Sequence, residues 1–93
     1  MNKSDLIKYV SDETLITESD ATVIIDAFLT GMKNGLDSDG KVMLKNFGTL
    51  FLQKRKSRVA IDPRNQNLIH VPAKTVVKFK SSKKLYDMVN KNV

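Results

Sequence analysis

The sequence predicts an α+β protein in which two helices are followed by an antiparallel sheet with a long inserted ribbon. Three observations lead to this fold class. Apolar residues recur at helical spacing as far as Leu36, and the pattern changes to strand-like alternation after Lys41. Residues 55–73 have strand-like composition at both ends and a polar tip between them. The same chain therefore holds a helical part, a sheet and an extension of the sheet.

The two helices are predicted from apolar spacing and from capping residues. Asn2 is a suitable N-cap for a first helix over residues 3–13, and Thr17 can cap a second one. The second helix carries an apolar stripe of about four turns. It is expected to end near Leu36, because the sequence DSDG at residues 37–40 is typical of a turn.

The sheet is predicted from three segments. Residues 41–54 indicate a β-hairpin that turns around Asn46 to Gly48, and a third strand is expected over residues 74–80. Ser81 or Ser82 then caps a last helix. Connections inside compact domains are usually about 4 to 6 residues long, so residues 55–73 are interpreted as a projecting β-ribbon arm.

The composition limits the function of the chain. Ninety-three residues are enough for one small domain, there is no cysteine, and His70 is the single histidine. No metal site, cofactor site or catalytic constellation is expected, and the protein is not predicted to be an enzyme. Without a membrane-spanning run or a signal-peptide pattern, we expect a soluble protein in the cytoplasm that has no membrane partner.

The charge is distributed unevenly along the chain. Residues 1–40 hold three basic and eight acidic side chains, whereas residues 41–93 hold thirteen basic and two acidic ones. Such a cationic half favours a polyanionic partner, with nucleic acid first and an acidic membrane surface second. A charged face that is merely solvated is the alternative.

Several motifs resemble the bacterial HU and integration host factor family of DNA-bending proteins. They are KVMLKNFGTLFLQKRKSR from Lys41, the Asp62-Pro63 pair, VPAK at residues 71–74 and FKSSKKLYDMVN from Phe79. The similarity also includes the opening MNKSDLIKYV and covers essentially the whole chain, and the short tail after Asn90 favours an HU-like protein. This family is itself the established example of minor-groove architectural binding, so its bending mechanism is carried over by resemblance.

The resemblance implies an intertwined dimer that bends double-stranded DNA with little sequence preference in the bacterial nucleoid. Residues 1–40 would form a helical dimerisation base, residues 41–54 and 74–80 a β-saddle, residues 55–73 the arm and residues 81–93 a C-terminal helix. Each arm would enter the minor groove and insert Pro63 between base pairs. Bent, nicked or four-way DNA would be favoured.

The predicted DNA-binding residues combine the resemblance with the basic clusters. The intercalating residue is Pro63, and Ile61 would extend its wedge. The remaining residues are Lys3, Asn46, Phe47, Gly48, Lys54, Arg55, Lys56, Arg58, Arg64, Lys74, Lys78, Lys80 and Lys83. Strand alternation predicts Lys54, Lys56 and Arg58 on one face of the ribbon with Arg55 on the other.

The arm tip departs from the family pattern. Asp62 is expected to repel phosphates, and Arg64 to compensate for an arginine that the family usually carries before the wedge. Gln66 and Asn46 stand where the family usually has glycine, and Ser82 replaces the glycine before the last helix. These differences predict that the body contributes more to binding, and the tip less, than is usual in the family.

The apolar stripe of the second helix predicts a homodimer, because two helices and three strands alone would leave too much apolar surface exposed. Phe28, Phe47, Phe51 and Phe79 are expected in the core. The dimer seam is expected to contain Phe28, Leu29, Met32, Leu44, Phe47, Leu50 and Phe79. The alternatives are a sequence-preferring subunit that pairs with a different chain, like integration host factor, and a module that binds RNA or another protein.

Overall fold

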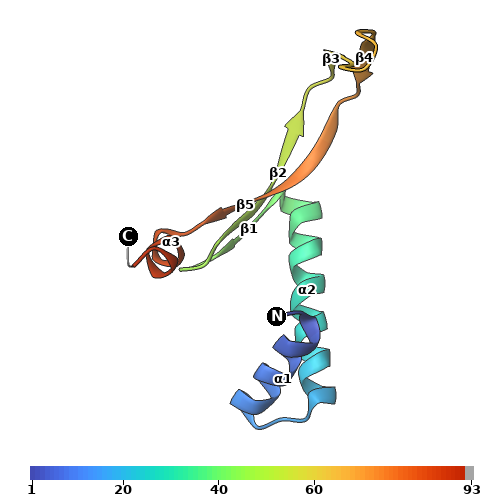
Figure 1. Ribbon diagram of the computed structural model, residues 1–93. Helices are drawn as coiled ribbons and strands as arrows, with labels where there is room; N and C mark the ends of the chain where they lie inside the picture. Colours follow the sequence, from blue (N-terminus) through green and yellow to red (C-terminus); the bar gives the residue numbers. More distant parts are fainter. Residues whose placement is uncertain (92–93) are drawn as a thin grey trace. The chain divides into compact units, whose positions relative to one another are not determined.

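The computed structural model describes residues 1–91, so Asn92 and Val93 of the tail lie outside the described residues. The fold is α+β, as predicted (Figure 1). Its elements are α1 (Lys3–Thr14), α2 (Glu18–Asp39), β1 (Lys41–Leu44), β2 (Gly48–Arg55), β3 (Arg58–Ile61), β4 (Leu68–Val71), β5 (Lys74–Ser81) and α3 (Lys83–Val89). They fall into two compact units, Met1–Ser38 and Asp39–Val93, which are described separately.

Both predicted N-caps of the first unit are confirmed. The Asn2 side chain accepts a hydrogen bond from the Asp5 backbone N–H at 3.1 Å, and the Asp5 carboxylate accepts one from the Asn2 N–H at 2.9 Å. This reciprocal pair is a capping box. The Thr17 hydroxyl accepts from the Asp20 N–H at 3.1 Å. Both helices therefore begin where the sequence places them.

The predicted end of the second helix is wrong. Residues 37–40 were expected to form a turn, yet α2 continues to Asp39 and stops at Gly40, which has a φ of +74°. A helix commonly ends on a residue in the left-handed conformation, and glycine adopts it without steric cost. The last turn of α2 contains Asp37, Ser38 and Asp39, and all three residues are exposed. Their polar side chains remain in solvent, so they can extend the helix without being buried.

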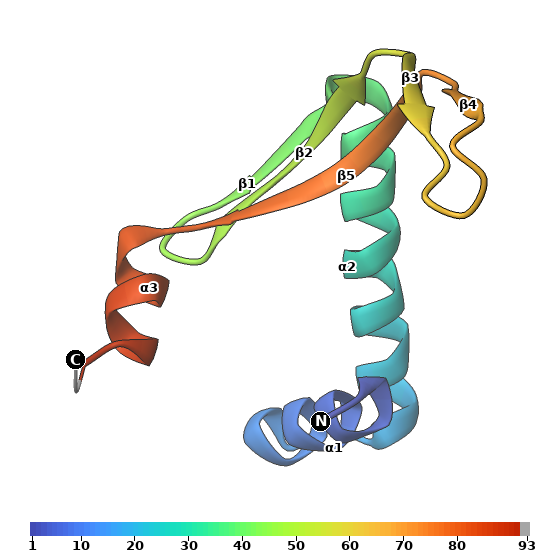
Figure 2. The ribbon, with the colours of Figure 1, turned by 45° about the horizontal axis from the view of Figure 1, so that its top comes forward.

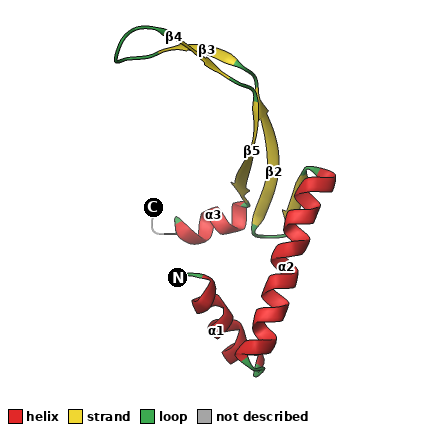
Figure 3. Ribbon diagram, turned by 90° about the vertical axis from the view of Figure 1, so that its right-hand side faces the viewer, coloured by secondary structure: helices red, strands yellow, loops and turns green. Residues whose placement is uncertain are grey.

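The helical unit buries little apolar surface within one chain. Ala21 is the single buried apolar residue among residues 1–91, and the side chain of Phe28 is 53% exposed. α1 and α2 follow one another as a helical hairpin (Figure 3). A cavity of about 460 Å³ in this unit is lined mainly by apolar residues from both helices, among them Leu6, Ile25 and Phe28. The apolar stripe of α2 is thus largely uncovered in the isolated chain.

The three-stranded sheet has the strand order β1-β2-β5, and both pairs are antiparallel (Figures 1 and 2). Its faces differ, because side chains alternate along a strand and directly paired residues share a face. The apolar sheet face carries Val42, Leu44, Leu50, Leu52, Val77 and Phe79. The cationic sheet face carries Lys41, Arg55, Lys74, Lys78 and Lys80, together with Phe51.

The turn between β1 and β2 lies where the sequence predicts it. Asn46 has a φ of +64°, the left-handed conformation that explains why the family pattern has glycine there. Gly48 is buried, and a Cβ atom built on it would lie 2.5 Å from Cζ of Phe79 and 2.6 Å from the carbonyl oxygen of Lys80. Only glycine lets β2 approach β5 this closely.

We expect Gly48→Ala to lower the free energy of unfolding by about 1 to 3 kcal/mol, the usual cost of overpacking. The matched control is Gly31→Ala in α2, where an added Cβ meets nothing within 4 Å. That change should raise stability by up to about 1 kcal/mol through helix propensity. Urea unfolding of both variants measures the difference. Equal midpoints for Gly48→Ala and wild type would contradict the role of this contact.

The predicted arm is a two-stranded antiparallel ribbon of β3 and β4, which continues beyond the ends of β2 and β5 (Figure 3). Arg58 pairs with Val71, and Ile61 pairs with Leu68 at the end of the ribbon. After β5, the Ser82 side chain accepts from the Leu85 N–H at 3.1 Å and caps α3. Ser81, the other predicted cap, is the last residue of β5.

Candidate nucleic-acid interface

The cationic sheet face gathers positive charge from two strands that are distant in sequence. Lys74, Lys78 and Lys80 share this face, as strand alternation predicts, and the register adds Arg55 opposite Lys74. Lys41 joins them at the edge, directly opposite Phe51. Every residue that the register places on this face is cationic or uncharged. The face therefore carries a net positive charge, which attracts anions.

Phe51 does not lie in the core, contrary to the prediction. It is half-buried on the cationic sheet face, where its directly paired neighbours are Lys41 and Lys78. Leu50, Phe51 and Leu52 are all apolar, so the sequence of this strand does not show which of them points to which face of the sheet. The register resolves it, because Leu50 and Leu52 point to the apolar sheet face and Phe51 between them cannot.

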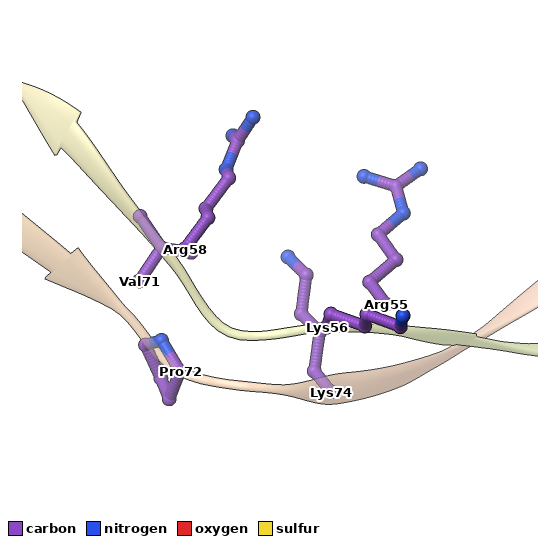
Figure 4. Close-up of a pocket in the computed structure, with 6 residues that line it drawn as sticks. All are labelled: Arg55, Lys56, Arg58, Val71, Pro72 and Lys74. Atoms are coloured by element: carbon purple, nitrogen blue, oxygen red, sulfur yellow. The ribbon is translucent and has the colours of Figure 1, made fainter.

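The predicted distribution of the arm cations over two faces is also wrong. Arg55 and Arg58 point to the same side of the ribbon (Figure 4). β2 ends at Arg55 and β3 begins at Arg58, so Lys56 and Ser57 interrupt the two-residue alternation on which the prediction relied. Lys54, also predicted to bind DNA, pairs with Thr75 on the apolar sheet face.

A cavity of about 310 Å³ lies at the junction of the sheet and the arm (Figure 4), and we call it the hinge pocket. It is lined by Arg55, Lys56, Arg58, Val71, Pro72 and Lys74. Four of these six residues are cations, and within residues 1–91 none of the four forms an ion pair. Four cations without a carboxylate partner therefore surround this cavity, and their combined charge attracts anions.

A second basic hollow, of about 470 Å³, lies between the β1–β2 turn and the end of β5. Lys45, Asn46, Gly48, Lys80 and Lys83 are among its lining residues. The Lys83 ammonium lies 3.2 Å from the Asp87 carboxylate, but this pair is exposed and one turn apart on a helix. Such pairs contribute little, so Lys83 is available to a stronger anion.

The hairpin residue Phe47 belongs to both predicted sets, DNA-binding and dimer seam. Its ring centroid lies 5.7 Å from that of Phe79, with an interplanar angle of 57°. This tilted arrangement is favourable for two aromatic rings. The backbone N–H of Ser82 donates to the Phe47 carbonyl at 2.9 Å, which fixes the turn against the start of α3.

The arm tip is held together by Asp62, which the sequence had suggested as a repulsive charge. Its side chain is buried, with a residue exposure of 7%, and accepts from the Arg64 backbone N–H at 2.9 Å. The Arg64 guanidinium lies 3.4 Å from the same carboxylate. Asp62 therefore shapes the turn and pairs with Arg64, whose side chain is 88% exposed, and the effect of the two charges on phosphates stays a prediction. Gln66 has a φ of +60°, which explains the usual glycine there.

Pro63 and Ile61 are exposed at the tip. The backbone N–H of Asp62 donates to the Asn67 carbonyl at 2.8 Å, and the Gln66 N–H donates to the Asp62 carbonyl at 2.7 Å. These bonds close the turn behind Pro63 while leaving its ring uncovered. The wedge residues are therefore accessible to a ligand.

The structure places two lysines, Lys3 and Lys41, differently from the predicted set of DNA-binding residues. Lys3, predicted to bind DNA, lies in the helical unit with its ammonium 2.6 Å from the Asp26 carboxylate, so its charge is already paired. Lys41 was not predicted, although it lies on the cationic sheet face. The alternation that begins at Lys41 was the available signal.

Over residues 1–91, no group of three or more His, Cys, Asp or Glu residues is placed to hold a metal ion. In the same range, no helix combines the length and apolar character needed to cross a bilayer.

Comparison with known proteins agrees with this geometry. A family model described as "Bacterial DNA-binding protein" matches residues 1–90. The DNA-binding protein HU of Clostridium pasteurianum is 35% identical over 91 residues, which cover 98% of this chain and 100% of the relative. The DNA-binding protein HU of Thermus thermophilus is 34% identical over 91 residues, which cover 98% of this chain and 94% of that relative. A cocrystal structure of Anabaena HU with DNA matches with a TM-score of 0.84 and 28% identity, covering 96% of this chain and 97% of that one.

Proposed function

This chain belongs to the HU family of bacterial DNA-binding proteins, and from that membership we propose that it binds duplex DNA with little sequence preference and bends it. Proteins of this family are structural DNA-binding proteins of the nucleoid and not enzymes, and dimers are typical of the family. Residues 1–93 act as one DNA-binding domain. Its place in the cell is the cytoplasmic nucleoid.

The cationic sheet face is the observation that supports this proposal most directly. Lys41, Lys74, Lys78 and Lys80 lie on it with Arg55, and the hinge pocket extends the charge towards the arm. Phosphate contacts carry no sequence information, so a surface of this kind binds duplexes of any sequence. A salt titration against a random duplex tests the function. Log K should fall linearly with log salt by about 0.9 for each phosphate neutralised.

The dimer is proposed from the uncovered apolar surface. Phe28 on α2 and the Phe47–Phe79 pair on the sheet are about half exposed in the single chain. A second copy that covers these groups would supply the core that one chain lacks. Leu29, Met32, Leu44 and Leu50 are half-buried and complete the proposed seam.

Bending is assigned to the arms. Pro63 projects from a closed tip and would enter an opened base step in the minor groove, with Ile61 beside it. We expect Pro63→Ala to give a clearly smaller bend than wild type in a fluorescence-transfer assay on end-labelled duplexes. Gln66→Gly is the control at the same tip, because its left-handed backbone accepts glycine, and it should keep the wild-type bend. Equal angles for Pro63→Ala and wild type would remove the wedge from the mechanism.

The Asp62–Arg64 pair predicts an unusual gain of affinity. Asp62→Asn keeps an oxygen that can accept from the Arg64 N–H, but it releases the guanidinium from a negative partner. The freed Arg64 can then contact a phosphate. We expect duplex affinity at 0.1 M salt to rise by about eightfold, the effect of one additional phosphate contact. Fluorescence anisotropy measures it. An unchanged salt slope would show that Arg64 is remote from the phosphates.

A further inference from the structure

The turn at the arm tip carries three consecutive side-chain amides, Asn65, Gln66 and Asn67, and all three residues are exposed. One of these amides is held in place, because the Asn65 side-chain oxygen Oδ1 accepts a hydrogen bond from the Asn67 backbone N–H at 3.0 Å. A side chain that is fixed in this way loses little conformational freedom when a ligand binds. Asn65 is therefore a preorganised polar group at the end of the arm.

The same hydrogen bond decides what the Asn65 amide offers to a ligand. An asparagine side chain has an oxygen that accepts hydrogen bonds and an NH₂ group that donates two of them. Because the Asn67 N–H already occupies the oxygen, the group that remains for a ligand is mainly the Nδ2 donor. Asn65 therefore acts as a hydrogen-bond donor with a fixed polarity.

The position of this donor relative to the wedge follows from the chain. Asn65 comes two residues after Pro63, and two residues span at most about 7 Å. Base pairs are stacked about 3.4 Å apart, so with Pro63 in a base step the Asn65 Cα lies within about two base pairs of that step. Arg64 lies between them, but Nε and Nη2 of its guanidinium lie 3.4 Å from the Asp62 carboxylate. A neutral donor is thus held close to the bases that flank the wedge.

The minor-groove edges of the two kinds of base pair differ in the property that a donor detects. A·T and T·A pairs present only acceptors there, N3 of adenine and O2 of thymine, whereas a G·C pair adds the N2 amino donor of guanine. A donor at the tip is therefore complementary to A·T pairs, but at a G·C pair it faces another donor. Minor-groove proteins commonly use asparagine and glutamine for this readout.

We propose that Asn65 is a specificity-determining residue, which reads the base pairs beside the wedge and gives each arm a preference for A·T over G·C. This inference rests on the proposed function, in which Pro63 enters the minor groove, and it adds a sequence preference to that function. One neutral hydrogen bond corresponds to about a fivefold difference in affinity. Sequence-specific proteins discriminate by about 10³-fold or more, so a preference of this size agrees with a protein that binds most duplexes.

The test measures affinity by fluorescence anisotropy for duplexes of alternating A·T, G·C or inosine·C pairs at one salt concentration. Inosine lacks the 2-amino group of guanine, so an inosine·C pair presents only acceptors in the minor groove while it keeps the major-groove groups of G·C. Wild-type protein should bind the A·T and inosine·C duplexes more tightly than the G·C duplex. Asn65→Ala removes the donor without adding charge, and it should lower the ratio of A·T to G·C affinity by about fivefold for each arm engaged.

Two further variants separate the Asn65 donor from the conformation of the tip. Asn65→Asp keeps Oδ1 for the Asn67 N–H and replaces the donor by an acceptor. Its affinity ratio should fall at least as far as that of Asn65→Ala, because a carboxylate accepts from the guanine amino group. Gln66→Gly is the matched control, because it removes an exposed amide from a left-handed backbone position that accepts glycine. This control should keep the wild-type ratio.

The other outcomes are equally decisive. A wild-type ratio that both Asn65 variants retain overturns the inference alone and assigns the preference to duplex flexibility. Wild-type protein without an A·T preference, an inosine·C duplex that binds like G·C, or a Gln66→Gly ratio as low as that of Asn65→Ala overturns it too. Wild-type protein that binds none of the duplexes overturns the proposed function as well. If melting shows that Asn65→Ala does not fold, Asn65→Asp, which keeps the hydrogen bond of the turn, still gives the ratio.

Discussion

Replacing Arg55, Arg58 and Lys74 by glutamine will reduce the salt dependence of DNA binding more than any other change of similar size. These three cations come from the ends of two separate sheets and converge on the hinge pocket. Each phosphate contact contributes about 0.9 to the slope of log K against log salt, so the slope should fall by about 2.7 for each arm engaged. Affinity at 0.1 M salt should fall by about 500-fold and approach that of wild type near 1 M.

The matched control for this experiment is Lys33→Gln, which removes an exposed cation from α2 in the helical unit. It changes the net charge by one without touching the cationic sheet face. Its slope should remain that of wild type. A general effect of net charge would instead lower the slope with each lysine removed, wherever it lies. Equal slopes for the triple glutamine variant and wild type would exclude the hinge pocket from the interface.

Replacing Phe79 by alanine will have the largest effect on stability. Its ring lies on the apolar sheet face, packs at 5.7 Å from Phe47 and contacts the position of Gly48, yet it is 47% exposed in the single chain. In the proposed dimer the remaining surface is covered by the second copy. Phe to Ala changes in cores cost about 3 to 5 kcal/mol. For a domain of this size, a loss of about 3 kcal/mol lowers Tm by roughly 12 °C or more.

The dimer gives this prediction a second signature, because the Tm of a protein that folds on association rises with concentration. Thermal melts at two protein concentrations and sedimentation equilibrium should show that Phe79→Ala dissociates at concentrations where wild type is dimeric. Tyr9→Ala is the control, since Tyr9 is an aromatic residue of α1, 58% exposed and outside the proposed seam. A Phe79→Ala protein that remains dimeric with an unchanged Tm would place the seam elsewhere.

Local sequence signals predicted the helix starts and the arm well, because these features depend on the chemistry of a few neighbouring residues. Asn2 and Thr17 were identified as caps, and Ser82 as one of two candidates with Ser81, because a short polar side chain before an apolar run can satisfy the free backbone N–H groups of a helix. Residues 55–73 were identified as an arm because they are too long and too strand-like for a compact connection. These features depend on neighbouring residues only.

The errors arose where a distant partner decides the outcome. α2 ends where a residue adopts the left-handed conformation, and that residue is Gly40. The polar residues of DSDG at 37–40 instead favoured a turn that begins at Asp37. Asp62 looked like a free negative charge beside a proline, but the closed tip buries it and gives it Arg64 as a partner. The sequence gives the sign of the Asp62 charge but not the residue with which it pairs.

By itself, the sequence determined the element order, the helix caps, the position of the arm and the cationic character of the second half, because spacing, capping chemistry and charge are carried by residues close together along the chain. The tertiary structure alone decided which cations act together. Cross-strand register assigns Arg55 and Lys74 to one face and Lys54 to the other, and after the break at Lys56 and Ser57 the Arg58 side chain points to the same side of the ribbon as Arg55. Pairing between strands fixes side-chain direction over distances that no local pattern records.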